Sequence, residues 1–474
     1  MKREPTFFES ISCFIVLGAV VGIGFGYYGI PIQPLLLVAA AYAALIALRV
    51  GVSWEKMEEG IIRRLKTAMP AIFILFSVGI IIGTWIYSGT VPMLIYYGLQ
   101  IISPTYFLVT SFVIVAVVSV ATGTAWGSTA TAGVALMGIA AELDVSLAMA
   151  AGAVISGGVF GDKLSPLSDT TNLAPLVVEV NLYEHIRHML WTTVPASIAG
   201  LIVWFFVGIN TDYSSASTGN VEGLLAELDM IYNWNVFMLI PFAIILWGAF
   251  RKKPVVPMML LSSVVAVVIG MLSNGFTLVD GMTSMADGFS VSMINAPGVD
   301  PASLSENVTS LIVRGGIFSM TTIVVTIFCG YAFAGIVEVA GCLDKILATF
   351  SKAIESTWKL VGVTILGSII IVFTAGVASI SIIMVGVLLQ DAYAKQGLHA
   401  KNLSRTLEDS GTMLLPFVPW GVSGLYYLEV LGVSVADYWL WAIPCYLCVV
   451  FAMFYAGTGI GIAKSEGQAA VKGE

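Results

Sequence analysis

One polar run inside an otherwise apolar stretch carries the residue types that could bind a cation. Residues 161–172 contain the carboxylates of Asp162 and Asp169, the ammonium of Lys163 and the amide of Asn172. Four hydroxyls stand among them, on Ser165, Ser168, Thr170 and Thr171. A charge at the centre of a bilayer costs about 2.5–3.5 kcal/mol on insertion scales. Because hard alkali cations take oxygen ligands, the run predicts a cation site. The structural alternative is an ion pair of Lys163 with Asp162 or Asp169 that pins a break in a helix.

Two further segments supply oxygen atoms that could complete this site. The first is a small-residue segment with three candidates, Thr122, Gly123 and Thr124. The second half of the chain offers a matching set, Ser379, Asp409, Ser410 and Thr412. Freed carbonyls and helix ends bind coupling ions in such segments of transporters. We therefore predict one cation or substrate site built from both halves, with Asp169, Asn172 and Asp409 as sodium ligands.

Proton exchange needs a group that titrates, and the sequence offers carboxylates for this role. Three histidines lie at predicted cytoplasmic ends of spans, where we expect solvated loop residues: His185, His188 and His399. Burial raises the pKa of a carboxyl group and a bound cation lowers it, so one acid can release its proton as sodium binds. We predict that Asp169 alternates between proton and sodium with Asp409 as its partner, and that Asp162 also takes part. Glu338 is a weaker candidate, because its side chain could equally extend to the interface.

The composition identifies the kind of element that must hold this site. Of the 474 residues, 58% are hydrophobic and 11% are charged, and the mean hydropathy is +0.95. Soluble domains carry about 25% charged residues, so a water-soluble enzyme is excluded. Apolar stretches long enough to cross a bilayer recur at 11–30, 34–50, 68–88, 190–209, 234–250, 255–273, 317–338 and 438–456. No Gly-x4-Gly-Lys-Ser/Thr loop occurs, and we expect no ATP-driven transport.

Four interrupted apolar segments predict irregular elements within the membrane. Segments 106–141 and 358–394 each contain a central cluster of Gly, Ser and Thr, and each half is too short to cross alone, which predicts re-entrant hairpins. Segments 146–180 and 402–430 are interrupted by the polar runs, which predicts broken helices lining a cavity. Trp126 lies at the first hairpin tip and is expected to shape the site.

The order of these segments repeats, which predicts an all-α polytopic membrane fold of two inverted repeats. Each repeat is expected to have five crossings, one of them a broken helix, plus one re-entrant hairpin. In this scheme Thr122 corresponds to Thr374, and Asp169 to Asp409. The expected units are a first repeat 11–209 (scaffold spans 11–88, hairpin 106–141, broken helix 146–180), an extracellular connector 210–233, a second repeat 234–456 (hairpin 358–394, broken helix 402–430) and a cytoplasmic tail 457–474.

The positive charges favour one orientation of this fold. If both termini are cytoplasmic, every Lys and Arg except Lys163 and Arg314 falls on the cytoplasmic side, as the positive-inside rule requires. The amphipathic connector 53–66 is then expected to lie on the cytoplasmic face. The outer loop 278–316 is expected to form an interfacial helix or, alternatively, a lid over an entry path.

The run 161–174, Gly-Asp-Lys-Leu-Ser-Pro-Leu-Ser-Asp-Thr-Thr-Asn-Leu-Ala, resembles the NhaC-type sodium/proton antiporter family within the ion transporter superfamily. Segments 122–128 and 408–412 are similar to two further motifs of that family, and the resemblance extends over essentially the whole chain. It implies sodium/proton exchange by alternating access, an inverted-repeat fold with paired hairpins, and a homodimer. Positions that match the family motif are Asp162, Ser165, Asp169, Thr170, Thr171 and Asn172.

These observations together predict a secondary antiporter of the cytoplasmic membrane that exchanges sodium for protons. We expect no enzymatic activity, no cofactor apart from the transported sodium ion, and no nucleic-acid partner. Since the family also contains malate/lactate antiporters, the alternative is a sodium- or proton-coupled exchanger of a small organic anion or amino acid. In that case Lys163, the hydroxyls and helix N-termini would hold a carboxylate. A channel is disfavoured, because paired hairpins with broken helices usually form an occluded site.

Overall fold

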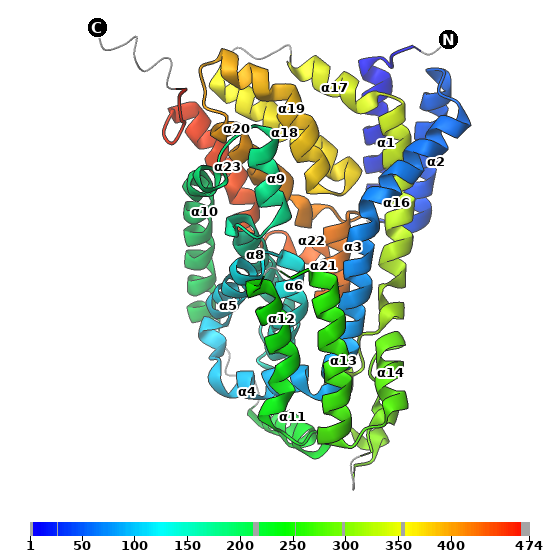
Figure 1. The fold of residues 1–474 in the computed structure, drawn as a ribbon, viewed down its shortest axis with the longest axis vertical. Helices are drawn as coiled ribbons and strands as arrows, with labels where there is room; N and C mark the ends of the chain where they lie inside the picture. Colours follow the sequence, from blue (N-terminus) through cyan, green and yellow to red (C-terminus); the bar gives the residue numbers. More distant parts are fainter. Residues whose placement is uncertain are drawn as a thin grey trace.

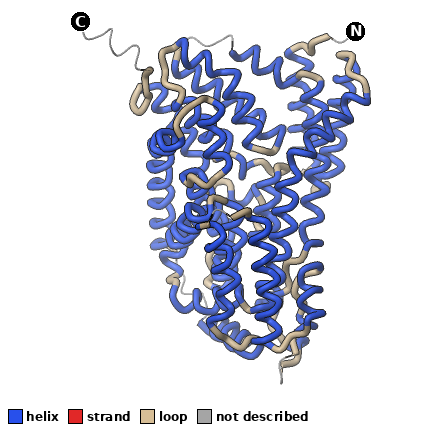
Figure 2. Tube along the Cα trace, in the orientation of Figure 1, coloured by secondary structure: helices blue, strands red, loops and turns tan. Residues whose placement is uncertain are grey.

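The computed structural model describes residues 3–25, 27–211, 218–251, 253–295, 299–351 and 356–465, and these form helices joined by loops and turns (Figures 1 and 2). No strand occurs in these ranges, apart from a single bridge between Leu398 and Lys464. Within them, ten helices are long and apolar enough to cross a membrane, or up to twelve if each bent pair counts as one span. The predicted all-α polytopic class is confirmed. Several expectations concern residues outside the described ranges, namely Lys2, Lys252, Lys352 and Lys472, 212–217 of the connector, 296–298 of the outer loop and 466–474 of the tail.

Six helices form a scaffold along one side of the molecule. They are α1 (Phe7–Gly24), α2 (Ile32–Arg49), α3 (Trp54–Ser88), α12 (Ile240–Phe250), α13 (Val255–Asn274) and α16 (Thr321–Val339). The long helices α3 and α16 pack on each other, α2 packs on α16, and α13 packs on α3. In Figure 1, α1 and α2 lie toward the end of the molecule that carries both termini, whereas α12 and α13 lie toward the opposite end.

The amphipathic connector 53–66 does not form a separate surface helix. It makes the first turns of α3, which continues without interruption to Ser88. These first turns pack closely against α16 at Gly60 and Gly335. A Cβ on Gly60 would lie only 2.8 Å from the carbonyl oxygen of Gly335, so the absence of a side chain allows this close approach. Glu338 on α16 pairs with Arg63 and Arg64 on α3, and this contact accounts for Glu338 without a role in transport.

The first half then forms a hairpin, a broken helix and a long helix. The hairpin consists of α5 (Phe107–Thr122), α6 (Ala125–Ser128), a π-helical turn η2 (Thr129–Gly133) and α7 (Val134–Glu142). The broken helix consists of α8 (Leu147–Leu164) and α9 (Asp169–Val177), and α10 (Leu182–Asn210) follows.

The second half repeats this order. Its hairpin is α18 (Thr357–Ala375) and α19 (Ala378–Lys395). The next elements are α20 (Lys401–Leu407), a π-helical turn η7 (Glu408–Thr412), η8 (Leu415–Phe417), α21 (Val422–Leu431), α22 (Val435–Tyr438) and α23 (Ile443–Thr458). In Figure 1 the α18–α19 hairpin lies at the end that carries the termini, whereas α4 (Thr90–Ile101), which leads into the first hairpin, lies at the other end. This arrangement fits inverted repeats; the side of the membrane that each end faces stays a prediction.

Short helices complete the chain between these units. They are η1 (Pro104–Tyr106), α11 (Thr218–Ile231), η3 (Val236–Leu239), α14 (Leu278–Ala286), η4 (Val291–Met293), η5 (Pro301–Ser303), α15 (Glu306–Ile312), η6 (Ile317–Met320) and α17 (Cys342–Ser351). In the described part of the expected outer loop 278–316, the structure places the α-helices α14 and α15 and the 3-10 turns η4 and η5. Its α14 packs against α3 and α13, which fits a structural element of the scaffold.

The first hairpin packs on the broken helix through glycines. A Cβ at Gly157 would lie 2.5 Å from the carbonyl oxygen of Phe112, and one at Gly161 would lie 2.5 Å from that of Ala116. Small residues at such positions let helices approach closely in membranes, where packing replaces the hydrophobic effect as the driving force. The polar run thus begins at the point where α8 is pressed against α5.

We expect Gly161→Ala to lower the free energy of unfolding by about 1–3 kcal/mol, because the added methyl group would overlap the backbone of α5. Thermal unfolding of the purified protein in detergent, followed by tryptophan fluorescence, would show a lower midpoint. Gly18→Ala on α1 is the matched control, since nothing lies within 4 Å of a Cβ there. Equal midpoints for the two variants would contradict the packing argument.

Candidate functional site

The tip of the first hairpin is a tight turn that rests on the broken helix. Gly123 has a φ of +68°, a left-handed conformation that favours glycine. A Cβ on Gly123 would lie 2.5 Å from the Cβ of Leu167, so the turn and the break are in direct contact. Thr124 caps the next helix, because its hydroxyl accepts a hydrogen bond from the Gly127 amide at 3.3 Å. Thr122 precedes the turn and is buried.

The break between α8 and α9 spans residues 165–168 and is held by three predicted site residues. The Ser165 hydroxyl donates to the Val120 carbonyl of the hairpin at 2.8 Å. The Thr171 hydroxyl reaches back across the break to the carbonyl of Lys163 at 3.0 Å. The Asn172 amide donates to the Pro166 carbonyl at 2.9 Å. Ser165 and Thr171 thus bond backbone carbonyls, and Asn172 keeps its Oδ1 available for an ion.

The second hairpin tip also has a glycine turn and a side-chain hydrogen bond to a carbonyl of the hairpin, but from a different kind of side chain. Gly376 has a φ of +66°, as the glycine of the first tip does. The Trp420 indole nitrogen donates to the Phe373 carbonyl at 2.7 Å, in the place that a serine hydroxyl takes in the first half. Ser379 lies in the first turn of α19 and is partly buried.

The second polar run does not break its helix, which corrects one expectation. Residues 408–412 continue α20 as a π-helical turn, and the bend comes later, between Phe417 and Val422. Proline explains the position of both breaks: Pro166 and Pro416 lack the N–H that a helix needs, so regular helix ends beside each of them. The Ser410 hydroxyl bonds the Thr406 carbonyl at 2.6 Å within the continuing turn.

Asp169 and Asp409 are therefore not structural counterparts. Asp169 is the first residue after its break, whereas Asp409 precedes the bend of the second half. Asp169 is exposed and Asp409 is fully buried. Whether both bind the transported ion stays a prediction, but the two side chains occupy different environments.

Asp409 is the centre of a buried charge cluster that joins the two halves. Its Oδ1 forms an ion pair with the Lys163 ammonium and accepts a hydrogen bond from the Thr192 hydroxyl of α10 at 2.8 Å. Its Oδ2 lies 4.0 Å from Nε of Arg405. Lys163, Arg405 and Asp409 are all inaccessible to solvent. The structural alternative, a pair of Lys163 with Asp162 or Asp169, is wrong, because the partner of Lys163 comes from the other half.

Three more carboxylates surround this ion pair. Asp162 is partly buried, Asp169 is exposed and Glu408 is fully buried. Asp169 and Glu408 both lie close enough to Asp162 to repel its charge. With Asp409, the region holds four acids against the two buried cations, Lys163 and Arg405. When all are ionised this surplus of negative charge attracts a cation.

Sequence reasoning missed Arg405, Thr192 and Glu408. Arg405 was expected on the cytoplasmic surface, but it is buried and donates through Nη1 to the Gly461 carbonyl at 2.9 Å. Glu408 stood inside a recognised motif, yet nothing in the sequence singled it out from the aspartate beside it. Thr192 lies in an ordinary apolar span, where periodicity carries no signal for a polar contact.

Two histidines were also placed incorrectly. His185 and His188 were expected to be solvated, but both are buried between α10 and α20. His185 Nδ1 lies 2.8 Å from the Ser404 hydroxyl, and His188 Nε2 lies 3.1 Å from Oδ1 of Asn402. The sequence places both histidines at the end of a membrane span, which suggested exposure to solvent. In the structure α20 packs over this part of α10 and buries them. His399 is partly exposed, nearer to the expectation.

Trp126 connects the first hairpin to the second broken helix, and its expected role in shaping the site stays a prediction. Its ring stacks on Tyr426 of α21 with centroids 5.1 Å apart. Its indole nitrogen donates to the Ser423 hydroxyl at 3.2 Å, and the Tyr426 hydroxyl donates to the Trp126 carbonyl at 2.5 Å. This contact ties the first hairpin to the second broken helix. The Trp420–Phe373 hydrogen bond adds the second hairpin and the Lys163–Asp409 ion pair adds the first broken helix, so the four elements form one unit.

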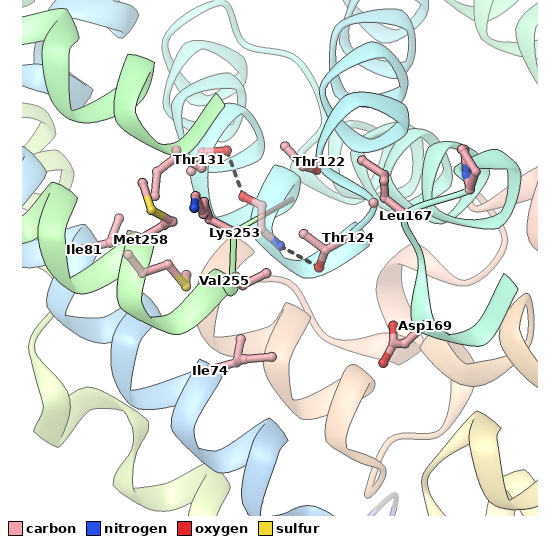
Figure 3. A pocket seen from close by; sticks show the side chains of 15 residues that line it. Ile74, Ile81, Thr122, Thr124, Thr131, Leu167, Asp169, Lys253, Val255 and Met258 are labelled. Atoms are coloured by element: carbon pink, nitrogen blue, oxygen red, sulfur yellow. Dashed lines mark hydrogen bonds between the residues drawn. The ribbon is translucent and has the colours of Figure 1, made fainter. Parts of the chain in front are cut away.

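A cavity of about 460 Å³ separates this unit from the scaffold (Figure 3). On one side it is lined by the hairpin tip and by Leu167 and Asp169, and on the other by residues of α3, α12 and α13. Lys253, which the charge distribution assigned to a cytoplasmic loop, lines the same cavity. Asp169 thus lines this cavity together with Thr122 and Thr124 of the hairpin tip.

No group of three or more His, Cys, Asp or Glu side chains in the described ranges is arranged to hold a metal ion. The prediction that Asp169, Asn172 and Asp409 bind sodium stays a prediction. The structure brings together the tip 122–124 with Asp169, and Lys163 with Asp409. A transported ion needs only transient, exchangeable ligands, which these separate oxygens can provide.

Comparison with known proteins gives a consistent result over the whole length. The family model described as the Na+/H+ antiporter family matches residues 6–171 and 157–460. An uncharacterized Na+/H+ antiporter of Haemophilus influenzae is 42% identical over 463 residues, 98% of each chain. The Na+/H+ antiporter NhaC of Alkalihalophilus pseudofirmus is 36% identical, over 94% of this chain and 93% of the relative. A malate-2H+/Na+-lactate antiporter of Bacillus subtilis is 33% identical over 96% of each chain.

Proposed function

The chain belongs to the Na+/H+ antiporter family, and we propose that it is a secondary antiporter that exchanges sodium for protons across the cytoplasmic membrane. The observation that carries the proposal is the excess of carboxylates, Asp162, Asp169, Glu408 and Asp409, over buried cations where the two halves meet. Acids in such a place are stable when they hold a proton or face a cation. Competition between the two ligands is the basis of exchange.

Sodium would enter through the cavity beside the first hairpin tip. Asp169 faces that cavity at the start of α9, and the hydroxyls of Thr122 and Thr124 line it as well. Asp162 lies near Asp169, so an ion that reaches Asp169 lowers the repulsion between the two acids. Because one cluster cannot hold the cation and all its protons together, sodium entry releases a proton.

Alternating access would follow from movement between the two sides of the cavity. The hairpins and broken helices are tied together through Trp126 and Lys163, whereas the opposite wall belongs to the scaffold helices α3, α12 and α13. A shift of one unit against the other would open or close this space without breaking the contacts within either. The homodimer implied by the family resemblance would keep the scaffold fixed, and stays a prediction.

One observation favours an organic substrate as the second candidate. The cavity of about 460 Å³ is far larger than a sodium ion needs, and it contains the ammonium of Lys253. The relative named as a malate-2H+/Na+-lactate antiporter fits this possibility. Lys163, expected to hold the organic carboxylate, is instead paired with Asp409, so Lys253 would take that role.

Proteoliposomes with a preset pH gradient distinguish the two candidates. Under the proposed function, addition of sodium chloride alone dissipates the gradient, and malate, lactate or arginine adds nothing. Under the second candidate, sodium alone leaves the gradient intact until one of these solutes is present. Lys253→Ala then gives a further check, because it should abolish solute-dependent flux and leave sodium/proton exchange in place. A wild-type protein that fails both assays contradicts both functions.

A further inference from the structure

Glu408 is a buried acid that the geometry leaves without a partner. It lies in the π-helical turn η7, and its side chain is inaccessible to solvent. Neither carboxylate oxygen has a hydrogen-bond partner among the described residues. The hydroxyl of Thr412, four residues on in the same turn, lies near this acid but does not have hydrogen-bond geometry to it or to any other described group. Single π-helical turns inside α-helices occur frequently at functional sites.

The neighbouring charges do not satisfy Glu408. The elements that pack around η7 include α8, α9, α18, α19, α20 and α23. The titratable and charged groups that they and the turn bring near this acid are Asp162, Lys163, Asp169, Tyr393, Arg405, Asp409 and Cys448. The ammonium of Lys163 is bound by Asp409, and Arg405 bonds Gly461 and faces Asp409. The two cations therefore serve the adjacent aspartate.

An unpaired carboxylate in this position is stable only in its neutral form or beside an added cation. Burial of an ionised carboxylate without compensation costs several kcal/mol even after relaxation of the protein. A neutral carboxylic acid avoids this cost, and so does a carboxylate that faces a metal ion. Asp162 and Asp169 lie within electrostatic range of Glu408, so an ion held by those two acids would favour its ionised state.

We propose that Glu408 is the group that carries the exchanged proton, while Asp162 and Asp169 hold the sodium ion. The inference rests on the proposed sodium/proton exchange and assigns its proton to one residue. When sodium reaches Asp162 and Asp169, the O–H bond of Glu408 breaks and the proton leaves to water on the open side. When sodium leaves, a proton from the opposite side restores the neutral acid. One cation replaces another at each step, so charge balances within the cluster.

The test compares Glu408→Gln with wild type in proteoliposomes. Glutamine mimics the neutral acid and cannot carry a proton. We expect sodium-driven proton release to fall to the level of protein-free vesicles, while exchange of radioactive sodium for unlabelled sodium persists. We also expect the thermal midpoint to stay at the wild-type value or to rise, because no hydrogen bond is lost. Glu429→Gln, an exposed acid on α21, is the matched control and should exchange normally.

Each outcome decides the matter. Wild-type proton release in Glu408→Gln overturns the inference, and so does loss of both fluxes in a folded variant, since Glu408 would then be a sodium ligand. If the glutamine variant does not fold, Glu408→Asp should shift the pH of half-maximal exchange, and an unchanged profile overturns the inference. If the wild type shows no sodium-driven proton movement, the proposed function fails. Difference infrared spectra then report separately whether a protonated carboxyl band of wild type disappears in Glu408→Gln.

Discussion

Replacement of Lys163 by methionine is expected to lower the free energy of unfolding by about 3 kcal/mol, because it leaves Asp409 buried without its ion-pair partner. Methionine has a similar length, so the cavity term stays small and the loss of charge dominates. Unfolding by denaturant in detergent micelles, followed by tryptophan fluorescence, measures the change. Exchange activity should be lost as well, since the pair links the end of α8 to η7 and α10.

The partner substitution should cost more. Asp409→Asn leaves two buried cations, Lys163 and Arg405, beside a neutral side chain, and the expected loss approaches about 5 kcal/mol. The double variant removes one charge of each sign and should recover most of the stability, giving a coupling energy well above experimental error. Additive losses in the three variants would show that the pair does not stabilise the fold.

An exposed ion pair provides the control for this cycle. Lys345 and Glu4 lie 3.3 Å apart, with side chains 36% and 85% exposed. Pairs of this kind contribute about 0–1 kcal/mol, because water screens both charges. Lys345→Met should therefore change the free energy of unfolding far less than Lys163→Met. A similar loss in both would mean that removal of a lysine, and not of a buried partner, destabilises the protein.

Proline, and not polarity, was the sequence signal that could have located the second break. The polar run 408–412 was expected to interrupt its helix, but carboxylates and hydroxyls can be accommodated by a π-helical turn that keeps the backbone bonded. Pro416 cannot donate a backbone hydrogen bond, so the helix ends there. In the first half Pro166 lies inside the polar run, so the run and the end of regular helix coincide there. The equivalence of Asp169 with Asp409 failed for the same reason.

Fold class followed from physics that acts on local sequence, whereas the site depends on contacts between distant residues. Apolar stretches of bilayer length and glycine-interrupted hairpins are visible in any short window. The partner of Lys163 is not, because Asp409 lies in the other half and only tertiary packing selects it over Asp162 next door. His185 was misplaced likewise, since its burial depends on how α20 covers α10.

The largest functional effect is expected at Asp169. Asp169→Asn should weaken the apparent sodium affinity roughly 5- to 1000-fold, the range given by one lost unit charge at about 4 Å between water-like and surface-like dielectric values. Sodium-dependent fluorescence quenching of a pH probe in proteoliposomes measures the half-saturating sodium concentration. Asp169→Glu should keep most of the affinity, since it retains a carboxylate facing the cavity. Asp391→Asn, at an exposed acid on α19, controls for loss of a negative charge elsewhere.

Measurement of the free energy of unfolding of Asp169→Asn distinguishes a role of Asp169 in sodium binding from a purely structural role. Asp169 lies in the first turn of α9, where a negative side chain interacts favourably with the helix N-terminus by about 0.3–1 kcal/mol. The same charge is repelled by Asp162 and Glu408, so the asparagine should leave the free energy of unfolding almost unchanged. Lys163→Met would then lower the stability of the contact between the two halves. Asp169→Asn would leave the fold intact and weaken sodium binding. If Asp169→Asn instead unfolds readily and retains wild-type sodium affinity, its carboxylate serves the helix and not the cation.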